Sequence, residues 1–94
     1  MPEQKLRVSF PLRLHDGTEH DVEGIALMVW REAVYDEDTY AGLEQVALVS
    51  AAVDGVELSD DQLRRFRDTY EQMYGEALEW IALSTLQARV SALH

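Results

Sequence analysis

The feature that most constrains the fold is a strict alternation of apolar and polar residues near the start of the chain. The apolar positions are Leu6, Val8, Phe10, Leu12 and Leu14, and the intervening positions are Lys5, Arg7, Ser9, Pro11 and Arg13. A period of two predicts a β-strand with one buried face and one exposed face. Because proline donates no backbone hydrogen bond, Pro11 in the exposed register places this strand at a sheet edge.

A turn and a second strand follow. Asp16 and Gly17 have typical turn chemistry, so we expect an antiparallel hairpin over about residues 5–31. The return strand is apolar at both parities from residue 25 to residue 30, and an alternative interpretation starts a helix at residue 25. We favour a strand in which a bulge at Gly24 moves the buried set from Val22 to Ile25, Leu27 and Val29.

The next segment predicts a helix over about residues 39–54. Asp38 is placed as its N-cap, and Asp54 and Gly55 as its stop. The residues that recur at spacings of three and four are Leu43, Val46, Ser50 and Val53. This spacing is typical of a mostly buried helix.

A longer helix is expected over about residues 60–93. Ser59 and Gln62 form a capping-box pattern at its start. One apolar stripe passes straight through Gly75, so the helix continues beyond that glycine with a bend, or breaks near it. The stripe comprises Leu63, Phe66, Tyr70, Met73, Ala77 and Trp80. A second stripe consists of Leu83, Leu86, Val90 and Leu93, which form an oligomer interface or close over the hairpin of the same chain.

Together these elements predict one α+β domain over residues 1–94, an N-terminal antiparallel β-hairpin packed on two or three C-terminal α-helices. No cysteine is present and no apolar run reaches the length of a membrane span, so a cytoplasmic protein without membrane association is expected. Residues 46–55 with Leu58 and Ser59 resemble the helix-loop-helix of tellurite-resistance TerB-like domains. The order of hairpin, acidic loop and helices resembles small phage tail-assembly chaperones at the level of architecture.

The charge distribution restricts the partners. Residues 16–61 contain thirteen carboxylates and one basic residue, Arg31, in a chain of net charge −10. Such a field favours basic partners and disfavours nucleic acid and anionic membranes. The one basic cluster, at residues 64–67, is short and surrounded by carboxylates. We therefore expect no direct contact with nucleic acid.

Two groups of residues resemble cation sites. His15 and His20 flank the turn with Asp16 nearby, which is a zinc-type ligand set, and residues 54–61 cluster oxygen ligands around a glycine. In the second group the position of the calcium-binding glutamate is occupied by Arg65. Ordinary turn and capping roles explain both groups better, so we expect no metal and no cofactor. No nucleophile motif or phosphate-binding loop is present, and no enzymatic activity is expected.

The remaining hypothesis is a small acidic protein-interaction module that binds and inhibits or regulates a larger protein or complex with a basic, nucleic-acid-binding surface. A phage-type inhibitor, an antitoxin and an immunity-like protein belong to this class, and in one version the carboxylates imitate nucleic acid. The alternative is a phage or oligomer assembly chaperone or structural subunit, including a homodimer, that uses the second helical stripe. Aromatic residues rimmed by carboxylates suit the first hypothesis. The predicted partner-binding residues are Asp21, Glu23, Trp30, Glu32, Tyr35, Asp36, Glu37, Asp38 and Tyr40.

Overall fold

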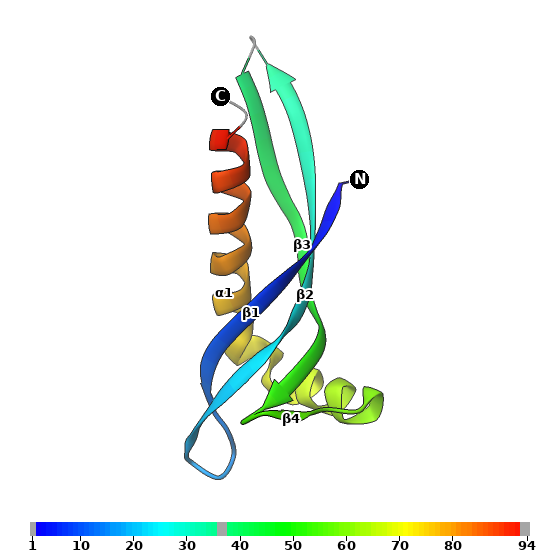
Figure 1. Cartoon of the computed structure of the whole chain (residues 1–94), viewed down its shortest axis with the longest axis vertical. Helices are drawn as coiled ribbons and strands as arrows, with labels where there is room; N and C mark the ends of the chain where they lie inside the picture. Colours follow the sequence, from blue (N-terminus) through cyan, green and yellow to red (C-terminus); the bar gives the residue numbers. More distant parts are fainter. Residues whose placement is uncertain (1, 36–37, 93–94) are drawn as a thin grey trace.

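The protein is an antiparallel four-stranded sheet followed by one long helix (Figure 1). This computed structural model describes the backbone of residues 2–35 and 38–92 and the side chains of residues 2–32 and 41–89. The elements are β1 (Glu3–Arg13), β2 (Glu19–Tyr35), β3 (Asp38–Val53), β4 (Val56–Glu57) and α1 (Asp60–Ala92). The strands are ordered β1-β2-β3-β4, and the sheet is curled into a half-barrel. No helix in the described part of the chain is long and apolar enough to cross a membrane.

The N-terminal hairpin forms as the sequence predicts. β1 pairs with β2 from Glu3↔Val29 to Arg13↔Glu19, and its even-numbered apolar residues from Leu6 to Leu12 are buried. The turn contains Gly17 at φ 79°, a conformation that glycine adopts without steric cost. Pro11 lies on the edge strand of the sheet, so its missing donor leaves no interior ladder position empty.

The predicted shift of the buried set in β2 is wrong. Val22, Ala26, Met28 and Trp30 are all buried, which keeps one parity throughout the strand, whereas Ile25, Leu27 and Val29 lie on the other face and are half-buried. Gly24 stays in register with Val8. A β-carbon at Gly24 would overlap the backbone carbonyl oxygen of Ser50, so glycine serves the close approach of β2 and β3 here.

The helix predicted over residues 39–54 is also wrong, because this segment is strand β3. Its register with β2 shifts at two places, where Glu44 and Val49 are the extra residues. Each bulge resets the side-chain alternation. The residues that face the core are therefore Ala41, Leu43, Val46, Leu48, Ala51 and Val53. The core-facing residues of β3 are therefore separated alternately by two and by three positions. This irregular spacing resembles the spacing of three and four that is typical of a buried helix.

Asp54 and Gly55 close a hairpin between β3 and β4 rather than ending a helix. Both have positive φ, 50° and 83°, and Val53 pairs with Val56 across them. Two successive left-handed residues are the requirement of a two-residue turn that matches the twist of a hairpin. The TerB-like helix-loop-helix is consequently absent from this region.

The long C-terminal helix is confirmed in outline. Ser59 accepts a hydrogen bond from the Gln62 amide at 3.3 Å, and Gln62 Oε1 accepts one from the Ser59 amide at 2.9 Å, which is the expected capping box. The helix continues through Gly75 and is bent in its yellow part (Figure 1). Its second half then runs beside the upper part of the β2–β3 hairpin (Figure 1).

The helix buries one stripe against the inner face of the sheet. The stripe consists of Phe66, Tyr74, Leu78, Ala82 and Leu86. Tyr74 lies between Phe10 of β1, at a ring-centroid distance of 5.5 Å, and Phe66, at 5.7 Å. The fold is α+β as predicted, but one helix covers a four-stranded sheet in place of two or three helices covering a hairpin.

Candidate protein-interaction surface

The outer face of α1 carries three large apolar side chains that are left uncovered by the residues that the structure describes. Trp80 is 71% exposed, Met73 is 55% exposed and Leu83 is 45% exposed. At 3.6 residues per turn they fall within an arc of about 80° on the helix surface. We call Met73, Glu76, Trp80 and Leu83 the outer face of α1. An exposed tryptophan between two other large apolar side chains is typical of a protein contact.

The sequence stripe had placed Met73 and Trp80 in the core, and the structure corrects this. The predicted stripe is confirmed as far as Tyr70 and again at Ala77, which packs partly buried against the core. Beyond Tyr70 the fully buried positions are Tyr74 and Leu78, one residue later than predicted. Because every fourth residue is buried, the direction of the buried side chains rotates about the helix axis by about 40° with each successive member of the stripe. Such a rotation is expected where a bent helix crosses a curled sheet. A strict four-residue spacing of apolar residues distinguishes the buried stripe from the exposed one. The residues that follow this spacing are buried, namely Tyr74, Leu78, Ala82 and Leu86, whereas Trp80 lies outside it and is exposed.

The charges around Trp80 are negative. Glu76 lies one helical turn before it, Glu79 is the preceding residue, and both are exposed. Neither forms an ion pair with a basic side chain in the described part of the chain. A partner with basic groups beside an apolar area therefore matches this surface.

A second uncovered surface lies on the side of the sheet opposite α1, which we call the open face. It carries Ile25, Leu27 and Val29 of β2, half-buried, and Val49 of β3, which is 42% exposed. A hollow of about 490 Å³ is lined by Lys5, Ile25, Leu27, Val49 and Ser50. Lys5 and Arg7 of β1 pair with Leu27 and Ile25, so two basic side chains border the apolar strip.

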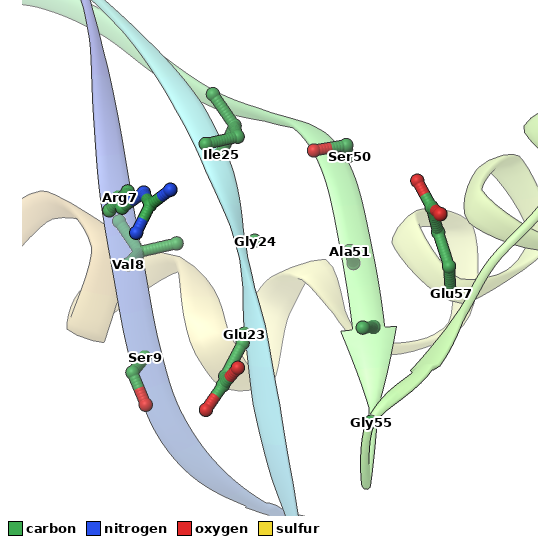
Figure 2. Close-up of a pocket in the computed structure, with 11 residues that line it drawn as sticks. Arg7, Val8, Ser9, Glu23, Gly24, Ile25, Ser50, Ala51, Gly55 and Glu57 are labelled. Atoms are coloured by element: carbon green, nitrogen blue, oxygen red, sulfur yellow. The ribbon is translucent and has the colours of Figure 1, made fainter.

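A wider depression of about 620 Å³ continues along the open face toward the turns (Figure 2). Figure 2 shows the sheet in front of the helix, with Arg7 on β1, Glu23 on β2 and Glu57 near the edge. Gly24, which has no side chain, lies in the middle of the depression (Figure 2).

The structure separates the sequence-predicted partner-binding residues. Trp30 is 1% exposed and belongs to the core, where its Nε1 donates to Glu32 Oε1 at 3.0 Å. Asp21, Glu23 and Glu32 are exposed on β2. The side chains of Tyr35, Asp38 and Tyr40, and residues 36 and 37 (Asp36 and Glu37) as a whole, lie outside the described residues.

The predicted oligomer stripe does not lie on one surface. Leu86 is 3% exposed and packs in the core, whereas Leu83 lies on the outer face of α1. The side chain of Val90 and all of Leu93 lie outside the described residues. Of the two members whose side chains are described, Leu83 is the exposed one, and it lies on the same face as Trp80.

The histidine at the hairpin has a structural role. His20 contacts Asp54 through Nδ1 and Asp16 through Nε2, joining the β1–β2 loop to the β3–β4 turn. Hydrogen bonding to Asp54 and then to Asp16 raises the pKa of His20. His15 packs on Tyr70, with ring centroids 5.1 Å apart, and does not join this cluster. No group of metal ligands suited to an ion is found among the residues that the structure describes.

Comparison of this chain with known proteins gives no relative. No family model, no curated protein and no solved structure matches the chain.

Proposed function

We propose that this protein is a non-enzymatic interaction module whose contact surface is the outer face of α1, and that its partner presents basic groups beside an apolar area. The observation that carries the proposal is the 71% exposure of Trp80 between Met73 and Leu83. The net charge of −10 supports a basic partner because it speeds the encounter with basic proteins.

The size of the exposed surface is sufficient for a binding hot spot. An aromatic side chain buries about 150–250 Å² in a contact. At about 25 cal/mol per Å², covering the exposed part of Trp80 contributes about 3–4 kcal/mol before the costs of association. A few such anchors dominate most interfaces.

Regulation of a larger basic protein follows from this surface as the biological consequence we propose. Occupying a basic surface with an acidic module excludes other acidic ligands from it, nucleic acid included. The remaining described carboxylates lie elsewhere, near the two turns, on the β2–β3 ribbon and along α1. The outer face of α1 therefore provides specificity while the overall charge provides attraction.

The test compares wild-type protein with Trp80→Ala as immobilised bait in a lysate of the native host, followed by titration of each purified captured protein. We expect Trp80→Ala to lose binding by at least tenfold, and wild-type binding to weaken with salt because charges are screened. Val56→Ala is the matched control, since Val56 is 67% exposed and lies on β4. The proposal would be refuted if wild-type protein and Trp80→Ala bound every captured protein with equal affinity and also associated with themselves to the same extent.

A further inference from the structure

The open face of the sheet has the features that the outer face of α1 requires in a partner. It holds an apolar strip, Ile25, Leu27 and Val29, that the helix of the same chain leaves uncovered. Val49 adds a further exposed apolar side chain from the neighbouring strand. The two uncovered apolar surfaces of one molecule thus lie on opposite sides of its sheet.

The lengths of the two surfaces agree. From Met73 to Leu83 the helix rises about 15 Å, at 1.5 Å per residue. From Ile25 to Val29 the strand extends about 13 Å, at about 3.3 Å per residue. A helix laid along β2 in this way covers the strip from end to end.

Two basic side chains border the middle of the apolar strip and two acidic side chains border the outer face of α1, while Glu3 and Glu23 lie at the two ends of the strip. Lys5 and Arg7 stand beside Leu27 and Ile25, about 7 Å apart along β1. Glu76 and Glu79 are about 4.5 Å apart along α1. None of these four side chains forms an ion pair with a residue that the structure describes. The basic pair on β1 and the acidic pair on α1 are therefore complementary in charge.

We infer that a second copy of this chain also binds the outer face of α1, and that the hollow beside Lys5, Leu27 and Val49 of that copy receives Trp80. This inference rests on the proposed function and adds a second copy of the chain to the partners of the same surface. The lysine ammonium at the rim of the hollow is placed to lie over the indole ring, where a cation is attracted to the aromatic face.

The arrangement sets the kind of assembly. The donor surface and the acceptor surface are different parts of the molecule, so the contact is heterologous and a bound pair of copies keeps one free donor surface and one free acceptor surface. Copies then add head to tail until a ring closes or a filament forms. We expect a mass that rises with concentration past that of a dimer.

Two variants test this directly. Trp80→Ala removes the donor surface, and Lys5→Glu combined with Val49→Asp removes the acceptor surface; both change exposed side chains. Each variant alone should sediment as a monomer in analytical ultracentrifugation. Their mixture retains one intact donor and one intact acceptor, so it should form a one-to-one dimer and stop there. Circular dichroism and thermal unfolding confirm that both variants are folded.

The outcomes separate this inference from the proposed function. Wild-type protein that stays monomeric at millimolar concentration, while a different protein is captured through Trp80, overturns the second-copy partner and leaves the proposed function standing. A symmetric dimer that Trp80→Ala abolishes and the mixture fails to restore overturns the head-to-tail contact. Self-association that Trp80→Ala leaves unchanged overturns the inference, and if captured proteins also bind equally, the proposed function fails with it.

Discussion

Nε2 of His20 lies 2.8 Å from Oδ2 of Asp16, and the other ring nitrogen contacts Asp54. A neutral imidazole donates one hydrogen bond, whereas the protonated ring donates from both nitrogens and satisfies both carboxylates at once. The Thr18 amide and then His20 lower the pKa of Asp16 to about 2, and His20 and the Asp21 amide lower the pKa of Asp54. Protonated His20 therefore joins the two loops.

This cluster predicts a pH window for stability. The raised pKa of His20 means that its contribution is complete below pH 6.5, its ordinary value, and is lost as the pH rises through the folded value. Because the pKa values of Asp16 and Asp54 are lowered in the folded protein, the contribution of these carboxylates to stability is present above pH 3.8. It is lost as the pH falls through their pKa values in the folded state. The contribution is therefore greatest between pH 3.8 and 6.5.

The measurement is urea unfolding of wild-type protein and His20→Gln across this range. We expect the difference in unfolding free energy to be largest near the acidic side of neutrality and to shrink in alkaline solution. The same difference at every pH would show that His20 acts through packing and not through its charge.

Gly24 predicts a large effect from a very small substitution. A methyl group there would overlap the Ser50 carbonyl oxygen and stand 3.1 Å from the Ala51 Cα, and both are backbone atoms that cannot rotate away. Gly24→Ala should lower the unfolding free energy by about 1–3 kcal/mol, the usual range for overpacking. Gly42→Ala is the matched control in β3, since no atom lies within 4 Å of the added carbon. Equal melting temperatures for the two variants would contradict this account.

The elements that depend on local chemistry could be predicted from the sequence. The alternation of apolar and polar residues in β1 is compatible only with a strand that has one buried face. The turn after β1 requires a glycine at its left-handed position, and Gly17 provides it. The capping box at Ser59 is a local pair of hydrogen bonds. Each of these patterns is complete within about ten residues. Tertiary contacts did not alter them.

The elements that depend on partners distant in the chain could not be predicted. β3 pairs with β2 through two bulges, and nothing local distinguishes bulges at Glu44 and Val49 from the turns of a buried helix. The predicted burial of Trp80 is wrong for a related reason. Which face of the helix is buried depends on the angle at which α1 crosses the sheet, and that angle is set by contacts distant in the chain. The sequence therefore favours Trp30 as the exposed aromatic residue, whereas the structure buries Trp30 and exposes Trp80.

The capping box predicts a measurable contribution at the start of α1. Ser59→Ala leaves the Gln62 amide without its acceptor, which should cost about 1 kcal/mol of unfolding free energy. Thermal unfolding is the measurement, with Thr69→Ala, an exposed position within the helix, as the control. A change no larger than that of the control would show that solvent satisfies this amide equally well.

The two tryptophans should respond in opposite ways to the same substitution. Trp30 is 1% exposed, with the guanidinium carbon of Arg89 5.0 Å from the ring centroid, so Trp30→Ala leaves a cavity and should cost about 3–5 kcal/mol. Trp80→Ala removes a side chain that is 71% exposed and should change the stability of the monomer by less than about 0.5 kcal/mol. Dilute samples, in which copies do not associate, keep the comparison to folding alone. A loss of stability in dilute Trp80→Ala as large as that in Trp30→Ala would mean that Trp80 belongs to the core of its own chain, and the outer face of α1 would then have no anchor.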